Sequence, residues 1–400
     1  MKEKEKTLLR YINKGTSRRN FIQRSALAGS GILLTGPMNL FAGSAQQPLT
    51  ANNISSTGLA ARSETSPLKP WSFERRSLEE DDVLVNIKYC GVCHSDIHQI
   101  RGDWGEQQYP QVPGHEITGI VEAVGDKVTK FKVGDRIGVG TMVGCTDDCK
   151  GCEEGKEQFC ENTLYTYGYK DPKSPTGITQ GGYSNNIVVK DSYAIKIPEN
   201  ISLENAASLL CAGITTYLPL VRHTIKKGDK VGVAGIGGLG HLAVKFAVAK
   251  GAEVYGFTTT PDKVEDILGF GAKEAIVVDD VKALQPYNKT LDYMISTIPF
   301  QYNVAAYAGV VKPGGSYTQV GMPEGFEVTI NNFMLASTEV NYDSWLTGGI
   351  PQTQDLVNYC AQNNIVPQTE IIRADEVNDA WEKVLNKKAR YRYIIDASTI

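Results

Sequence analysis

Residues 230–241 read KVGVAGIGGLGH, and this stretch decides the fold of the 400-residue chain. Its first five residues predict a short buried strand, and the glycines that follow predict a tight turn into a helix. Gly235 allows the turn, while Gly237 and Gly238 let a pyrophosphate approach the backbone. Gly240 permits close packing of the helix against the strand. Free N–H groups and the dipole at the helix start favour an anion, so the stretch predicts a dinucleotide site.

Strand and helix patterns alternate on both sides of this stretch. Further apolar runs predict strands over 253–257, 275–278, 291–296 and 315–320, and a helical pattern covers 203–220. This βαβ rhythm predicts an α/β fold, a parallel and doubly wound sheet of the Rossmann type with helices on both faces.

The chain before Pro198 has a different pattern of predicted elements. Strand-like runs over 83–88 and 117–124 are separated by glycine turns, which predicts a small β-rich, barrel-like domain. The C-terminal segment is expected to pack back onto this domain. The predicted boundaries are a linker over 46–66, rich in Asn, Ser, Thr and Ala, a β-rich domain over 67–212 and 344–400, and a doubly wound domain over 213–343.

Composition excludes two classes of partner. The formal net charge is −4, and no basic stripe is present, so we expect no nucleic acid. No run in the body of the chain reaches the roughly 18 apolar residues that a transmembrane helix needs. We therefore expect no transmembrane span in the mature protein.

Residues 1–45 resemble a twin-arginine export signal. Basic residues precede the pair Arg18-Arg19, Phe21 follows two positions on, and a modestly apolar run covers 25–34. Small residues fit cleavage just after Ala45. The pattern predicts the twin-arginine export machinery as a partner and a periplasmic location. The alternative is an amphipathic or disordered tail with a chance arginine pair, and the protein would then stay in the cytoplasm.

Two thiols and one imidazole form a candidate catalytic metal site. Cys93 lies in the motif CGVCHSDIH, His115 in PGHE and Cys211 in LCAG. This ligand set leaves a tetrahedral zinc one open position, which a catalytic zinc needs and a structural zinc does not. Taken alone, Cys211 would be interpreted as a small buried hydrophobic residue. The LCAG motif and the other two ligands upstream are what predict that it binds a metal.

A denser cluster consists of Cys145, Cys149, Cys152 and Cys160. Four thiolates close a tetrahedral zinc completely, so the cluster predicts a structural zinc and two zinc ions per chain. The alternatives are a partly filled, labile site or a disulfide formed after export.

In this order the motifs resemble those of the zinc-dependent medium-chain alcohol dehydrogenases, most closely their cinnamyl-alcohol-dehydrogenase-like branch of aldehyde reductases. The resemblance covers residues 66–398 and rests on 89–98, 113–116, 210–215 and 235–241. It implies a GroES-like catalytic domain beside the Rossmann domain, and hydride transfer between NADP(H) and a small-molecule alcohol/aldehyde pair, preferably a primary alcohol. We also expect a homodimer.

The resemblance implies a role for each residue near the catalytic zinc, whose ligands would be the two thiols and the imidazole named above. Asp96 orients the His115 imidazole, and Glu116 lies beside the metal, where it displaces water or coordinates transiently. Ser95 hydrogen-bonds the substrate oxygen. His98 is the solvent-side base of a proton relay. A histidine suits this role because its unperturbed pKa of about 6.5 lets it exchange protons near neutral pH. Without the motif, His98 would be a surface or cap residue.

The segment after strand 253–257 determines the choice between NAD and NADP. An NAD enzyme places a carboxylate there, whereas this chain has Thr258. Threonine hydroxyls and Lys263 can bind a 2′-phosphate, so NADP(H) is predicted, although Asp262 nearby keeps NAD open. The predicted cofactor-binding residues are His94, Thr215, Gly235, Gly237, Gly238, Leu239, Gly240, Thr258, Thr259, Thr260 and Lys263.

The cysteine cluster departs from the family spacing. The first gap is one residue longer than usual, so Thr146 stands where the first ligand is expected and Cys145 stands one residue early. The sequence therefore leaves open whether Cys145 is a zinc ligand.

Two other functions remain open from the sequence. One is an NAD-linked polyol or secondary-alcohol dehydrogenase of the same superfamily. The other is a non-catalytic exported metal-binding protein on the same scaffold, because free NADP(H) is expected to be scarce outside the cytoplasm.

Overall fold

The computed structural model describes residues 52–146, 152 and 154–400. The predicted export signal, cleavage position and Cys149 lie outside the described residues. Among the described residues no helix is long and apolar enough to cross a membrane.

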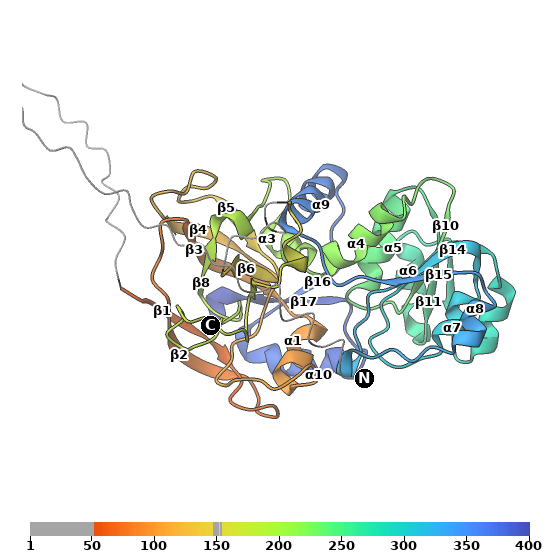
Figure 1. Ribbon diagram of the computed structural model, residues 1–400, viewed down its shortest axis with the longest axis horizontal. Coiled ribbons are helices and arrows are strands. Elements are labelled where there is room, and N and C mark those ends of the chain that lie inside the picture. The colour runs from red at the N-terminus through yellow and green to blue at the C-terminus, as the bar shows by residue number, and fades with distance from the viewer. Residues whose placement is uncertain (1–51, 147–151, 153) are drawn as a thin grey trace, which may run out of the picture. The chain divides into compact units, whose positions relative to one another are not determined.

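A six-stranded parallel sheet forms the doubly wound domain, as the alternating pattern predicts. Its strand order is β12-β11-β10-β13-β14-β15 (Figure 1). The strands are β10 (Lys230–Ala234), β11 (Glu253–Thr258), β12 (Glu274–Val277), β13 (Leu291–Ser296), β14 (Val311–Gln319) and β15 (Asn341–Ser344). The helices are α4 (Ala212–Arg222), α5 (Gly240–Ala249), α6 (Val264–Gly269), α7 (Val304–Ala308) and α8 (Asn332–Ala336), with short turns η5 (Pro261–Lys263), η6 (Val281–Tyr287) and η7 (Glu324–Phe326). The order reverses beside β10, where α/β sheets bind ligands at the strands' carboxyl ends.

A seven-stranded sheet forms the core of the catalytic domain, in the order β16-β17-β3-β4-β5-β9, with β8 beside β3. The C-terminal strand β17 pairs antiparallel with β3, so the end of the chain does pack back onto the first domain. The strands are β3 (Asp82–Gly91), β4 (Ile117–Val124), β5 (Arg136–Val139), β8 (Asn186–Lys190), β9 (Ile195–Lys196), β16 (Thr369–Ile372) and β17 (Arg392–Asp396).

Shorter elements complete the catalytic domain. A two-stranded sheet of β6 (Met142–Cys145) and β7 (Thr163–Tyr165) carries part of the cysteine cluster. The helices are α1 (His94–Arg101), α3 (Leu203–Ala207), α9 (Ile350–Asn363) and α10 (Val377–Leu385), with short turns η2 (Glu157–Phe159), η3 (Asp191–Tyr193), η4 (Ser208–Leu210), η8 (Ala374–Glu376) and η9 (Ala397–Thr399).

The prediction of a linker over 46–66 is wrong for residues 54–60, which form a strand. Strand β1 (Ile54–Ala60) pairs antiparallel with strand β2 (Lys69–Arg75) over seven residue pairs. The many Ser and Thr residues give this segment the composition of a linker, but they are equally compatible with a two-stranded sheet that has one solvent-exposed face. Leu59 and Ala60 are buried and anchor the strand. At the other predicted boundary, β15 runs to Ser344, one residue beyond 343.

The helix predicted over 203–220 is interrupted at Cys211. Helix α3 passes into η4, and α4 starts afresh at Ala212. Between them, Cys211 has φ −133° and ψ −72°, outside the helical region. The break places the Cys211 thiol at the N-terminus of α4, instead of on the side of a continuous helix.

Candidate active site

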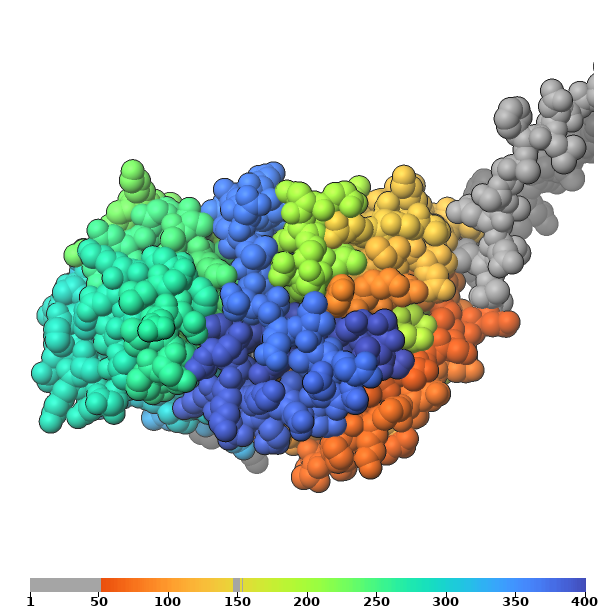
Figure 2. Space-filling view, turned by 180° about the vertical axis from the view of Figure 1, so that it is seen from behind, coloured from red at the N-terminus to blue at the C-terminus, as the bar shows by residue number. Residues whose placement is uncertain are grey.

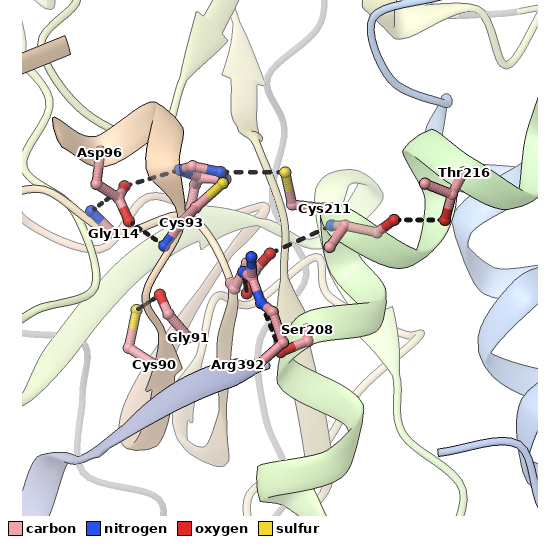
Figure 3. Close-up of polar contacts among 12 residues, drawn as sticks. Cys90, Gly91, Cys93, Asp96, Gly114, Ser208, Cys211, Thr216 and Arg392 are labelled. Atoms are coloured by element: carbon pink, nitrogen blue, oxygen red, sulfur yellow. Dashed lines mark hydrogen bonds and ion pairs between the residues drawn. The ribbon is translucent and has the colours of Figure 1, made fainter. Parts of the chain in front are cut away.

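The three predicted ligands of the catalytic zinc come together from three separate elements. Cys93 precedes α1, His115 precedes β4, and Cys211 precedes α4. Their ligand atoms lie within 4.8 Å of one another, and His115 Nε2 is 3.1 Å from Cys211 Sγ. The sulfur atoms of Cys93 and Cys211 point toward the same space (Figure 3). This sulfur and nitrogen set fits zinc, with one tetrahedral position left for a substrate oxygen.

The Cys93 thiol is prepared for metal binding by its surroundings. Hydrogen bonding with Cys211 and with His115 holds the pKa of Cys93 well below the ordinary thiol range, although burial acts in the opposite direction. A thiolate is the form that binds a metal.

Asp96 is buried and positions the ligands around it (Figure 3). Its two oxygens accept five hydrogen bonds, from His115 Nδ1 at 3.0 Å, Tyr167 OH at 2.7 Å, Tyr183 OH at 3.0 Å, Gly114 N at 3.1 Å and Cys93 N at 2.9 Å. The bond to Nδ1 leaves His115 Nε2 free to face the thiols, and this fixes the tautomer a zinc ligand needs. The sequence does not point to the two tyrosines, because only the fold brings them near Asp96.

Glu116 forms a buried ion pair with Arg392 of β17, the residue that is labelled in Figure 3. Its other oxygen accepts a hydrogen bond from the Ala212 backbone N–H at 3.2 Å. Burial raises the pKa of Glu116 to about 7, and Arg392 opposes that shift. Coordination of a metal by Glu116 would therefore disturb at least one of these two contacts. The sequence analysis missed Arg392, whose only local signal is a cation inside an apolar strand.

Ser95 and His98 both line the cleft that contains the metal ligands. No direct hydrogen bond joins them among the described residues. Instead His98 Nδ1 lies 2.7 Å from Asp103 Oδ2, while the buried Nε2 has no hydrogen-bond partner within the described part of the chain. The His98 ring stacks on the His94 ring and on the Trp104 ring, with ring centroids 4.6 Å and 5.1 Å apart. Sequence reasoning missed Asp103, although it follows His98 closely.

His94 also lines this cleft. Burial, followed by the neighbouring His98, lowers the pKa of His94 to about 4, so its imidazole is neutral near pH 7. Trp104 lines the same cleft and packs on Phe326 from the doubly wound domain, with ring centroids 5.4 Å apart. Trp104 thus lies at the cleft and not in the core.

The predicted cofactor residues line the same cleft as the metal ligands, with a volume of about 860 Å³. The residues concerned are His94, Thr215, Gly235, Gly237, Gly238, Leu239, Thr258, Thr259, Thr260 and Lys263. Gly240 is not among them.

The glycine turn leaves room for a ligand at its centre. A Cβ on Gly237 would meet no atom within 4 Å, so the backbone there faces open space. A Cβ on Gly240 would lie 2.0 Å from the Gly235 carbonyl oxygen, so no side chain fits behind the turn. Gly235 itself has φ +82°, where glycine is favoured. The cradle therefore fits a pyrophosphate at the start of α5.

The cysteine cluster contains Cys145 and not Thr146. The thiols of Cys145, Cys152 and Cys160 lie within 4.8 Å of one another, and Cys145 Sγ is 3.4 Å from Cys160 Sγ. Thr146 is exposed, and its hydroxyl donates to the Asn162 carbonyl at 3.4 Å. Three thiols at these distances could supply three of the four ligands that a structural zinc needs.

Comparison with known proteins identifies the family of this chain. Residues 79–199 match the family model of the alcohol dehydrogenase GroES-like domain, and residues 238–362 match the family model of the zinc-binding dehydrogenases. The chain is 40% identical over 341 residues to NADP-dependent alcohol dehydrogenase C 1 of Mycolicibacterium smegmatis, covering 85% of this chain and 97% of that protein. It is 41% identical over 344 residues to the aldehyde reductase YahK of Escherichia coli, covering 86% and 98%.

A solved structure shares the fold closely. The cinnamyl alcohol dehydrogenase of Helicobacter pylori, complexed with NADP(H), has a TM-score of 0.83 and 41% identity, covering 87% of this chain and 99% of that one. This chain therefore belongs to the zinc-type medium-chain alcohol dehydrogenase family. Within that family it is similar to cinnamyl alcohol dehydrogenases and aldehyde reductases.

Proposed function

We propose that this protein is a zinc- and NADP(H)-dependent alcohol dehydrogenase or aldehyde reductase. One observation carries the proposal: the Cys93, His115 and Cys211 ligand atoms and the glycine turn line a single cleft. A cofactor held by the turn and a substrate held at the metal would then meet in that cleft. The names of the relatives quoted above agree with this activity.

Each part of the reaction has residues in the cleft to perform it. Cys93, His115 and Cys211 would hold zinc, which polarises the substrate oxygen, while bound NADPH supplies the hydride. Ser95 would hold the proton at the substrate oxygen. His98 would exchange that proton with solvent, with its ring oriented by Asp103 and by stacking on Trp104. Because Ser95 and His98 are not directly bonded, the relay requires a further hydroxyl or water between them.

NADP(H) is the proposed cofactor because of the residues at the end of β11. Thr258 replaces the carboxylate that would hold an NAD ribose. Its hydroxyl accepts a hydrogen bond from the Thr260 N–H at 3.1 Å, which closes the loop around the proposed phosphate site. Lys263 is buried at the same cleft.

The four cysteines Cys145, Cys149, Cys152 and Cys160 are proposed to hold a second, structural zinc. The three described thiols already converge. Metal analysis of freshly purified protein should find two zinc ions per chain, and one ion would refute this site.

The substrate end of the cleft combines aromatic and polar groups. Trp104, Phe326 and Tyr169 offer aromatic surface, and Gln99 and Gln107 offer amides. The aromatic surface favours an aldehyde or primary alcohol with an apolar body. The amides favour the second candidate, polyol oxidation, and a mannitol dehydrogenase of Apium graveolens is 40% identical over 348 residues.

A substrate panel tests the proposed activity. Aldehyde reduction and alcohol oxidation, including mannitol, are measured with NADPH and NADH, before and after removal of zinc by a chelator and its restoration. We expect zinc-dependent aldehyde reduction that prefers NADPH. Activity that survives complete metal removal in folded protein would contradict the mechanism, and faster mannitol oxidation with NAD would support the second candidate. Inactivity with every substrate in zinc-loaded protein would favour a metal-binding role.

Export through the twin-arginine pathway is proposed for the N-terminal segment. Support comes from the order of basic residues, arginine pair, apolar run and small residues. An alignment also covers 97% of the Mycolicibacterium smegmatis relative but only 85% of this chain, so this chain has residues that lie outside the match. N-terminal sequencing of a periplasmic fraction should begin near Gln46, and full-length protein found only in the cytosol would refute export.

A homodimer is proposed from the edge of the doubly wound sheet. Within the described part of the chain, strand β15 has a neighbour on one side only, and Phe333 of the adjacent α8 is 84% exposed. An open edge and an apolar side chain of this kind are suited to pairing with a second copy. Light scattering on the purified protein should give twice the chain mass.

A further inference from the structure

The segment after β11 carries two carboxylates that would repel a 2′-phosphate if they were left unneutralised. They are Asp262 and Asp266, which flank the buried Lys263. Both contact Arg390, which comes from the other domain: its Nη2 lies 2.5 Å from Asp262 Oδ2 and its Nε lies 3.6 Å from Asp266 Oδ2. Tyr391 OH also donates to Asp266 Oδ2 at 2.7 Å. The C-terminal segment therefore neutralises the charge beside the proposed phosphate site.

The same contact joins the two domains. The dark-blue C-terminal residues lie against the green-to-teal residues of the doubly wound domain in Figure 2, and the ion pair between Arg390 and Asp262 spans that junction. Arg390 Nη1 is buried and has no hydrogen-bond partner among the described residues. The Nη1 group of this guanidinium is therefore available to donate a hydrogen bond.

Two lysines line the cleft without a carboxylate partner among the described ion pairs. Lys263 Nζ donates to the Ile236 carbonyl at 2.8 Å and lies 5.2 Å from the centre of the Tyr391 ring. Lys387 Nζ lies 5.2 Å from the centre of the Phe300 ring, and both Lys387 and Phe300 line the cleft. With the two aspartates held by Arg390, these ammonium groups remain available for an anion.

The two lysines are close enough to affect each other. Burial, then the charge of Arg390, lowers the pKa of Lys263 to about 8, and Lys387 lowers it further. Lys387 follows α10 with φ +59°, a conformation that favours glycine. The N–H of Lys388 donates to the Lys383 carbonyl at 2.8 Å, so this conformation ends α10. The helix ending places Lys387 at the cleft, without a carboxylate partner among the described ion pairs.

We propose that Lys387 and Arg390, both from the C-terminal segment of the catalytic domain, determine specificity for the 2′-phosphate of NADP(H). Lys387 provides positive charge to the phosphate directly. Arg390 is a positioning residue that acts through Asp262 and Asp266 by neutralising their carboxylates. Specificity then depends on both domains and not only on the threonines after β11. The inference rests on the proposed NADP(H) dependence.

Binding of cofactor fragments to the full-length protein tests this inference without turnover. Calorimetric titration compares adenosine 2′,5′-bisphosphate with adenosine 5′-monophosphate, which differ only in the 2′-phosphate. Lys387→Ala should weaken binding of the bisphosphate by about tenfold and leave the monophosphate unchanged, since a charged hydrogen bond contributes on this scale. Lys388→Ala is the matched control, because this neighbouring exposed lysine does not line the cleft.

A rescue experiment separates the role of Arg390 from a structural one. Arg390→Ala should also weaken bisphosphate binding selectively, and the double change Asp262→Asn with Asp266→Asn in the same chain should restore it. A purely structural role for Arg390 would weaken both ligands and would not be rescued. Should Arg390→Ala fail to fold, Arg390→Lys and the Lys387 variant still test the inference.

The two hypotheses fail in different ways. Wild-type protein that binds both fragments equally would overturn the NADP(H) assignment and this inference with it. Wild-type protein that prefers the bisphosphate, with no selective loss in Lys387→Ala or Arg390→Ala, would overturn this inference alone.

Discussion

Replacing Asp96 by asparagine tests how far the catalytic zinc site depends on a residue that does not bind the metal. Asp96 accepts five hydrogen bonds, one of them from His115 Nδ1. Asparagine keeps the shape but turns one acceptor oxygen into an NH₂ donor. If that group replaces Oδ2, it faces the Cys93 backbone N–H, now 2.9 Å away, and this donor cannot reverse its direction.

The expected losses follow from those contacts. A buried donor left unpaired costs about 1–3 kcal/mol, so the unfolding free energy should fall by about that amount. Loss of the carboxylate behind a zinc histidine reduces metal affinity by about 10–100-fold. Since a tenfold change corresponds to about 1.4 kcal/mol, the zinc site should weaken by about 1.4–2.8 kcal/mol.

Competition for zinc with a chromogenic chelator measures the affinity, and thermal melts of metal-free and zinc-loaded protein measure the stability. Asp103→Asn is the matched control, because the same chemical change is made at a carboxylate that contacts His98 and no metal ligand. The control should slow turnover by about tenfold, part of what a general base contributes, and leave zinc affinity unchanged. Unchanged zinc affinity in Asp96→Asn, or an equal loss in Asp103→Asn, would refute the reasoning.

Four further outcomes are expected. Thr258→Asp should weaken NADPH binding far more than NADH binding in fluorescence titrations, because a carboxylate would then face the 2′-phosphate; a wild type that prefers NADH would contradict this. NADPH affinity should fall as the pH rises above about 8, because the phosphate binds protonated Lys263, whose pKa burial lowers to about 8; a flat profile between pH 7 and 9.5 would exclude a role for that charge. Cys152→Ser should lower the melting temperature and the zinc content to one per chain, with turnover per folded molecule little changed. Arg18→Lys with Arg19→Lys should keep the protein in the cytosol, since the export machinery reads arginine and not charge; processed protein in the periplasm would contradict this.

The sequence predicted those features that depend on short segments. The strand, glycine turn and helix around Gly235 follow from local periodicity and from a backbone conformation that glycine favours. The three predicted ligands of the catalytic zinc could be recognised because each lies in a short motif of its own. The parallel sheet followed from the alternation of strands and helices, since such connections have few permitted topologies.

Local patterns also misled where polar residues form structure. The Ser- and Thr-rich residues after Ile54 have the composition of a linker, yet they form β1 because β2 supplies hydrogen-bond partners. The helical pattern over 203–220 contains two helix-breaking residue types, Gly213 and Pro219, yet the chain breaks at neither of them but at Cys211. In both places contacts made by the folded chain override local propensity.

Only the tertiary structure decided which side chains support the ligands. Asp96 meets Tyr183 across 87 positions, and Glu116 meets Arg392 across 276, so no motif could contain either pair. It also selected Cys145 over Thr146, because the pairing of β6 with β7 determines which side chain faces the other thiols. Ligand motifs are encoded locally because a metal needs a few donors of the right chemistry. Their hydrogen-bond and charge partners depend on which helices, strands and loops of the catalytic domain lie side by side, and that is determined by packing over the whole chain.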